Sequence, residues 1–105
     1  MDSRRRVGWS RPAVAALNEA LAYIAAESPQ GASSVARAAL ESADSLATLA
    51  ERGRVVPEIG RATIREIFVF RYRLIYRVGS DRVTVIAFLH GARDFERWRR
   101  GLEAE

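Results

Sequence analysis

The sequence predicts an α+β domain in which an antiparallel helical hairpin packs on one face of a small antiparallel sheet. In the first half of the chain, alanine is frequent and apolar residues recur at three- and four-residue spacing. In the second half, β-branched and aromatic residues alternate with arginine, a pattern typical of strands. The chain has 105 residues, of which 49% are hydrophobic and 29% charged, so we expect one globular domain over residues 1–105.

An edge strand and two helices are predicted first. Residues 6–10 have strand character, and Ser10 followed by Pro12 is a typical helix start. The apolar face of this helix, which ends near Ala26, comprises Val14, Leu17, Leu21 and Ile24. Ser28 and Pro29 begin the second helix, which we expect to continue toward Gly53. Its apolar positions are Val35, Ala39, Leu46 and Leu49.

Three strands are predicted after a loop over residues 54–60. The first covers residues 63–68, the second residues 71–78 and the third residues 83–90, and their short connections make an antiparallel meander. In the second strand, one face comprises Tyr72, Leu74, Tyr76 and Val78, and the other Arg71, Arg73, Ile75 and Arg77. In the third, one face comprises Val83, Val85, Ala87 and Leu89. Asp94 begins a short C-terminal helix.

The composition excludes several kinds of chemistry. All 17 basic residues are arginine, so no lysine can form a Schiff base. There is no cysteine and only one histidine, so we expect no disulfide, no metal site and no cofactor. No apolar run approaches the length of a membrane span, and the basic N-terminus is not followed by an apolar signal core. We therefore expect a cytoplasmic protein that does not bind membranes.

Arginines among the strand residues of segment 61–94 predict a surface for a negatively charged partner, either an acidic protein or nucleic acid. The predicted binding residues are Arg65, Arg71, Arg73, Arg77, His90, Arg93, Phe95 and Trp98. Simpler interpretations stay open. Arg73 and Arg77 fit a solvated sheet face equally well, and a histidine at a strand end is more often structural than catalytic. Phe95 and Trp98 form an apolar pair that docks on its own chain, lies under a partner or supports a dimer.

Four segments in this order resemble the ParE/RelE superfamily of bacterial toxins, and most closely its ParE-like members. They are Gly53–Glu58, Ile64–Glu66, Tyr72–Val78 and His90–Asp94. The resemblance extends from Val7 to Asp94. It implies the toxin component of a type II toxin–antitoxin system, neutralised by a ParD-like antitoxin whose flexible C-terminal segment folds on the toxin.

The resemblance implies one of two modes of toxicity. ParE-like toxins bind and stall DNA gyrase, which requires a surface and no catalytic residues. RelE-like toxins are ribosome-dependent mRNA endonucleases that need no metal, and the candidate catalytic residues for that activity are Arg65, Arg73, His90 and Arg93. The sequence favours gyrase, because it lacks the lysines and the C-terminal tyrosine of the RelE type. A third alternative is a homologue that only binds antitoxin and leaves growth unaffected.

Overall fold

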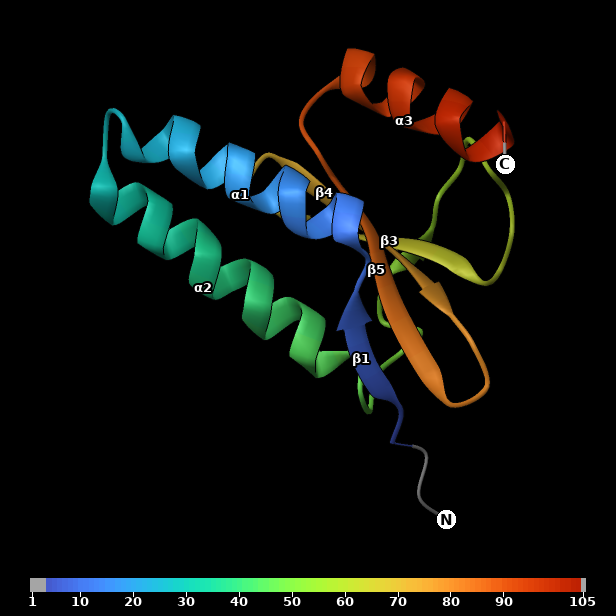
Figure 1. Ribbon diagram of the computed structural model, residues 1–105. Coiled ribbons are helices and arrows are strands. Elements are labelled where there is room, and N and C mark those ends of the chain that lie inside the picture. The colour runs from blue at the N-terminus through green and yellow to red at the C-terminus, as the bar shows by residue number, and fades with distance from the viewer. Residues whose placement is uncertain (1–3, 105) are drawn as a thin grey trace.

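A computed structural model describes residues 4–104 (Figure 1). Its elements are β1 (Arg6–Trp9), α1 (Arg11–Ala25), α2 (Pro29–Ser45), β2 (Arg54–Val55), β3 (Ile64–Val69), β4 (Tyr72–Val78), β5 (Arg82–Leu89) and α3 (Ala92–Ala104). The strands form one sheet in the order β1-β5-β4-β3-β2. The predicted edge strand, helical hairpin, meander and C-terminal helix are confirmed. Within residues 4–104, none of the helices has the length and apolar character needed to cross a bilayer.

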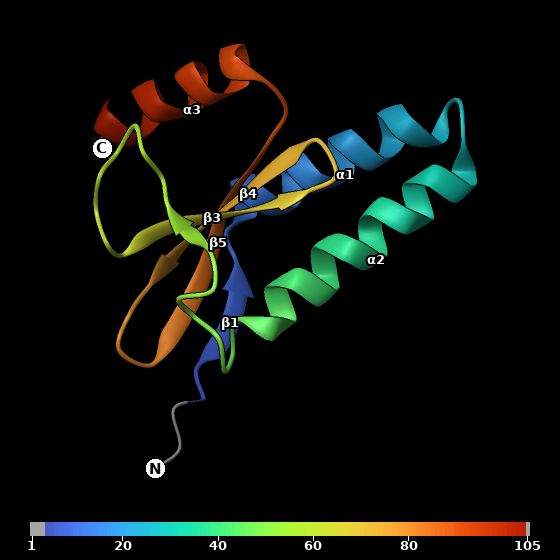
Figure 2. The same cartoon turned by 180° about the vertical axis from the view of Figure 1, so that it is seen from behind.

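Serine side chains cap the two long helices as their sequence positions predict. The Ser10 hydroxyl accepts a hydrogen bond from the Ala13 N–H at 3.2 Å, and the Ser28 hydroxyl accepts one from the Gly31 N–H at 2.9 Å. The helices lie side by side as an antiparallel pair (Figures 1 and 2). These caps fix where both helices of the hairpin begin.

Two predicted core positions of the helices are wrong. Helix α2 ends at Ser45 instead of continuing toward Gly53, and residues 46–52 are mostly in turns. Leu49 therefore leaves the apolar row of α2 and is 56% exposed. On α1, Val14 is 42% exposed because the buried row begins at its neighbour Ala13. The predicted apolar row of α1 is thus wrong only at Val14, because Leu17, Leu21 and Ile24 pack in the core, and the predicted row of α2 extends too far.

The sheet is mixed and has one strand more than the predicted meander and edge strand. Strand β1 pairs in parallel with β5, with Val7 opposite Val83. Strand β2 pairs antiparallel with β3, with Arg54 opposite Glu66, in a segment that the sequence predicted to be a loop. A strand of two residues is too short to show an alternating pattern, so no sequence signal distinguished it from a loop.

A β-bulge reverses the alternation of β5. Ile75 lies opposite Ala87 and Tyr76 lies opposite Val85, so Ile86 is an extra residue in β5. The predicted common face of this strand is therefore wrong beyond the bulge. Val83 and Val85 pack toward the helical hairpin, whereas Ala87 and Leu89 pack in the core on the opposite face.

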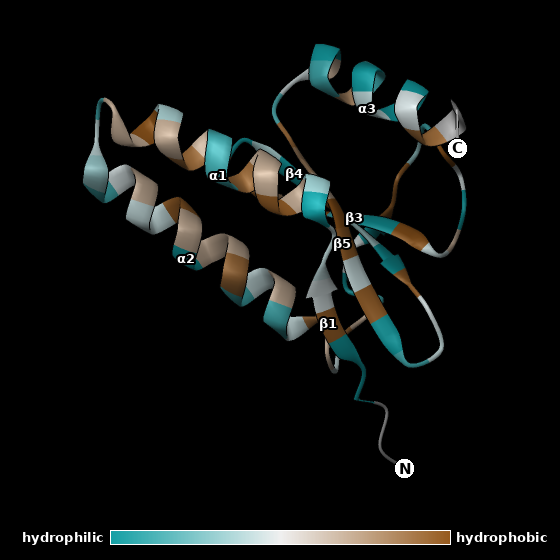
Figure 3. Ribbon diagram, in the orientation of Figure 1, coloured by the Kyte–Doolittle hydropathy of each residue, from teal (hydrophilic) through white to brown (hydrophobic). Residues whose placement is uncertain are grey.

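The sheet is covered on both faces. One core, which includes Leu17, Ala39, Leu74 and Tyr76, lies between the sheet and the helical hairpin. A second core lies on the opposite face, beneath α3 and the loop between β2 and β3; it comprises Val56, Ile64, Ile75, Ile86, Ala87, Leu89 and Phe95. Helix α3 is mostly hydrophilic (Figure 3) and contributes only a few apolar residues to this core. The sheet face that was expected to be open is therefore partly buried.

Candidate functional site

Arg73 lies at the centre of a charged cluster between the sheet and α3. Its Nε donates to Glu66 Oε1 at 2.6 Å, and its two Nη atoms donate to the Glu58 carboxylate at 3.0 and 3.2 Å. Arg54 Nε donates to the second oxygen of Glu66 at 2.6 Å. The Arg73 guanidinium also lies 4.3 Å from the centre of the Phe95 ring. We call Arg54, Glu58, Glu66, Arg73 and Phe95 the Arg73 cluster.

The cluster shifts the pKa values of two of its members in opposite directions. Hydrogen bonds from Arg73 lower the pKa of Glu58, because they stabilise its charged form. Burial alone would lower the pKa of Arg73, but its bonds to Glu58 and Glu66 outweigh burial and raise it. The Glu66 side chain is fully buried and both of its oxygens are satisfied. Arg73 is therefore already bound by carboxylates of its own chain.

The other predicted arginines differ in whether their own chain binds them. Arg65 Nε donates to the Ala62 carbonyl and its Nη1 donates to the Gly53 carbonyl, both at 2.9 Å, so Arg65 braces the chain around β2. The side chains of Arg71, Arg77 and Arg93 are exposed. No hydrogen bond or ion pair holds these three in the part of the chain that the structure describes, so their guanidinium groups can meet a partner.

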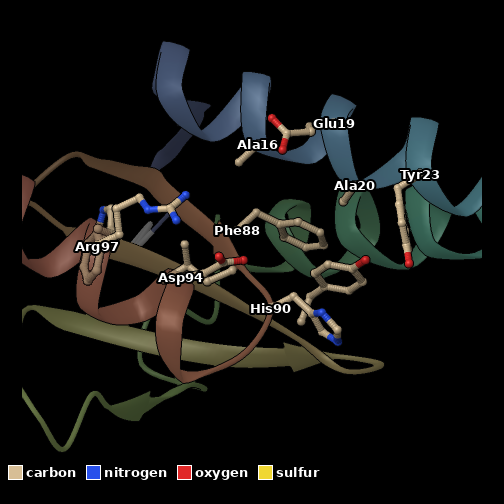
Figure 4. Close-up of a pocket in the computed structure, with 11 residues that line it drawn as sticks. Ala16, Glu19, Ala20, Tyr23, Phe88, His90, Asp94 and Arg97 are labelled. Carbon is tan, nitrogen blue, oxygen red and sulfur yellow. The ribbon is translucent and has the colours of Figure 1, made fainter.

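His90 follows Leu89, the residue opposite Arg73, but its ring lies with a stack of aromatic rings on the other face of the sheet from the Arg73 cluster. Its ring is 4.9 Å from that of Tyr72, which in turn stacks on Phe88 at 4.8 Å with an interplanar angle of 10°. Burial raises the pKa of the Tyr72 hydroxyl. These three rings form the floor of an open groove of about 400 Å³ between α1, the sheet and α3 (Figure 4).

We call this cavity the α1–α3 groove. Ala16 and Ala20 on α1 face it with small side chains, and Glu19 and the 75% exposed Tyr23 form its rim. Helix α3 contributes Asp94, Arg97 and Trp98. An aromatic floor with both signs of charge at the rim can hold an apolar side chain and pair with polar groups beside it.

The predicted apolar pair of α3 divides between the two sites. Phe95 is 2% exposed and packs on the sheet, so its docking is intramolecular. Trp98 lies 5.6 Å from the Phe95 ring, is half-buried and lines the α1–α3 groove. The structure thus places Phe95 in a core and Trp98 at the edge of that core, where it lines the α1–α3 groove.

Sequence reasoning gave no role to Tyr23 and Glu58, which contribute to these sites, or to the exposed Phe68 near the Arg73 cluster. Tyr23 lies outside the apolar row of its helix, and that position was a usable signal for an exposed aromatic side chain. Glu58 gave no such signal, because it pairs with Arg73 across 15 residues of chain. Phe68 was predicted as an ordinary strand residue but is 55% exposed. Among the described residues, no group of three or more His, Cys, Asp or Glu side chains could hold a metal ion.

The comparisons with known proteins agree with this fold. The family model described as the ParE toxin of type II toxin–antitoxin systems, parDE, matches residues 7–95. The chain belongs to the ParE toxin family. A solved structure titled "Chromosomal ParDE TA system from P. aeruginosa" matches this ParE-type toxin with a TM-score of 0.68. The match covers 86% of this chain and 99% of that chain at 17% identity, so it shows a shared fold. A search of curated proteins found no match.

Proposed function

We propose that this ParE-type toxin inhibits DNA gyrase by binding to it in the cytoplasm, and that a ParD-like antitoxin neutralises it. The observation that carries this proposal is the separation of the candidate residues for RNA cleavage. Arg73 is held in the Arg73 cluster, Arg65 is bonded to backbone carbonyls, and His90 lies in the α1–α3 groove. Metal-free RNA cleavage requires a base, an acid and cations around a single phosphate. Their separation therefore supports a toxin that acts through recognition.

The α1–α3 groove suits the antitoxin. Its aromatic floor can bury an apolar anchor from a segment that folds on binding, and such anchors supply most of the affinity of an interface. Arg93 precedes the groove residue Asp94 in the chain and is exposed, so it can meet a carboxylate of the same segment. Pairing of opposite charges at the rim of a binding site mainly speeds the encounter of the two proteins and fixes the position of the bound segment in the groove.

A gyrase supercoiling assay with purified toxin tests the proposed target. We expect the toxin to block supercoiling, the toxin saturated with its antitoxin to leave supercoiling intact, and His90→Ala to inhibit as strongly as the unmodified chain. Unimpaired supercoiling at saturating toxin would refute the gyrase target. Intact mRNA together with an induced DNA-damage response in cells expressing the toxin would distinguish gyrase inhibition from translation arrest.

A further inference from the structure

The turn between β3 and β4 carries a strained aromatic residue. Val69 lies opposite Tyr72, so Phe70 and Arg71 are the two residues of a tight hairpin turn at the end of the sheet (Figure 2). Phe70 has a φ of 55°, in the left-handed region that suits glycine or asparagine and is rare for a bulky residue. Its side chain is 65% exposed, so the ring gains little burial in return. A strained residue whose side chain lies in solvent points to a contact outside the chain.

The surroundings of Phe70 are aromatic and basic. Phe68 lies two residues earlier, is 55% exposed and has the Arg54 guanidinium 5.4 Å from its ring centre. Arg71 is exposed, and no group within residues 4–104 binds its guanidinium. We call Arg54, Phe68, Phe70 and Arg71 the aromatic turn.

The carboxylates close to the aromatic turn are already bound within the chain. Glu66 is held by Arg54 and Arg73, and Glu58 is held by Arg73. Because Arg54 uses only its Nε for Glu66 and its side chain is 59% exposed, the outer part of its guanidinium still faces solvent. Glu96, which lines the same hollow as Arg54, Phe68 and Arg71, is 52% exposed and lies 3.7 Å from Arg99. The aromatic turn therefore presents two rings and two guanidinium groups, on a chain of net charge +4.

We propose that the aromatic turn binds single-stranded DNA, with bases stacked on Phe70 and Phe68 and phosphates bound by Arg71 and Arg54. Aromatic rings next to basic side chains are how proteins bind unpaired bases without sequence readout. A protein partner fits less well, because a two-residue turn is small and a stable protein interface buries roughly 1,200 Å² or more. Single-stranded RNA offers the same bases and phosphates and differs by its 2′-hydroxyls, so competition by oligouridine separates the two ligands in the test below. This inference does not depend on the gyrase target.

Fluorescence anisotropy with a labelled oligothymidine of about 12 nucleotides tests the proposal at low salt. The decisive variant is Phe70→Asn, because asparagine adopts the left-handed conformation readily. We expect Phe70→Asn to melt at the same or a higher temperature than the unmodified chain while its affinity for the oligonucleotide falls about five- to 100-fold. Retained folding with lost binding would show that the ring is kept for the ligand.

Two pairs of matched variants distinguish contacts made by the aromatic turn from general effects of charge and of exposed apolar surface. Arg71→Gln should weaken binding more than Arg37→Gln, which removes the same charge from an exposed position on α2. Phe68→Ala should weaken it more than Leu40→Ala, which removes an exposed apolar side chain from α2. Unlabelled oligouridine and duplex DNA of equal length serve as competitors, and both should compete less well than oligothymidine.

Several results would overturn the proposal. They are the absence of binding at low salt, equal affinity of Phe70→Asn and the unmodified chain, and equal losses in the Arg71 and Arg37 variants. Stronger competition by duplex DNA would indicate binding by charge alone, and stronger competition by oligouridine would indicate an RNA site. A Phe70→Asn variant that binds DNA normally but loses affinity for the antitoxin would assign the aromatic turn to a protein partner.

Discussion

The guanidinium of Arg73 lies 4.3 Å from the centre of the Phe95 ring, so one arginine joins the central sheet to the last helix. The same guanidinium is bound by Glu66 in β3 and Glu58 in the preceding loop. An arginine that appeared suited to an anionic partner therefore holds three segments of its own chain together. This arrangement makes α3 sensitive to changes in a few side chains.

Replacing the Phe95 ring should loosen α3. Phe95 is 2% exposed, and deleting a buried ring typically costs about 3–5 kcal/mol. For Phe95→Ala we expect a lower melting temperature and faster amide hydrogen exchange in residues 92–104 than in the sheet. Phe95→Leu, which keeps most of the apolar volume, is the matched control and should lose less. Unchanged exchange rates in α3 of Phe95→Ala would contradict this role of the ring.

The ion pair between Glu58 and Arg73 should make stability depend on pH in the acid range. Hydrogen bonds from Arg73 lower the folded-state pKa of Glu58 below its ordinary value of 4.5. The unfolded chain then binds a proton more readily, so the stabilisation is present above about pH 4.5 and is lost as the pH falls through the lowered pKa.

Thermal melts between pH 3 and 7 of the unmodified chain and of Glu58→Gln test this dependence, with the range set around the ordinary carboxyl pKa of roughly 4. The Glu58 side chain is 40% exposed, so the difference should be small. We expect the unmodified chain to lose stability more steeply on acidification than Glu58→Gln does. Glu27→Gln, at an exposed position in the connection between α1 and α2, is the control and should follow the unmodified chain.

Gly53 is required by the close approach of Tyr76. The Tyr76 hydroxyl accepts a hydrogen bond from the Gly53 N–H at 2.9 Å and donates one to the Ala50 carbonyl at 2.8 Å. A Cβ atom at position 53 would lie 2.5 Å from the Glu66 carbonyl oxygen and 2.7 Å from the Tyr76 hydroxyl. Gly53→Ala should therefore destabilise the fold by about 1–3 kcal/mol in denaturant unfolding.

The control for Gly53→Ala is the same substitution at Gly101 in α3, where an added Cβ would meet nothing within 4 Å. Alanine is the better helix former, so Gly101→Ala should leave stability unchanged or raise it by about 0.5–1 kcal/mol. Equal effects of the two substitutions would show that the contact with Tyr76 does not restrict position 53.

The alternating pattern predicted the two faces of β4 correctly, because successive side chains of a strand point to opposite faces of the sheet. Tyr72 and Tyr76 pack toward the helical hairpin, whereas Arg73 and Ile75 face α3, as the sequence indicated. The same reasoning failed in β5, because one inserted residue, Ile86, reverses the alternation without any signal in composition.

The periodicity of the sequence could not predict which groups the arginine side chains bind. Arg73 pairs with residues 7 and 15 positions away, and a repeat of two residues carries no information on contacts across strands and loops. The strain at Phe70 was equally hidden, because the β-turn preferences that identify Gly or Asn turns assign no special meaning to phenylalanine. The short connection did predict a hairpin, but its residue types did not reveal the exposed aromatic turn.

The α1–α3 groove provides a direct test of the proposed antitoxin site. Ala20 leaves space above the aromatic floor of Tyr72 and Phe88, and Tyr23 forms part of the rim. Ala20→Trp should fill the groove and weaken antitoxin binding at least about tenfold in calorimetric titration, because the anchor of the antitoxin loses its site. Tyr23→Ala, a truncation of an exposed side chain, should also weaken binding.

Ala15→Trp is the matched control for the groove-filling variant, because Ala15 is exposed on the same helix and does not line the groove. It adds an identical side chain to the surface of α1, so it should bind antitoxin normally. A tryptophan at position 20 can disturb the packing of α1, so circular dichroism melts must accompany the titration. If Ala20→Trp unfolds, Tyr23→Ala still tests the site. Normal affinity in a folded Ala20→Trp and in Tyr23→Ala would place the antitoxin elsewhere on the toxin, since neither filling the groove nor removing its rim would then affect the interface.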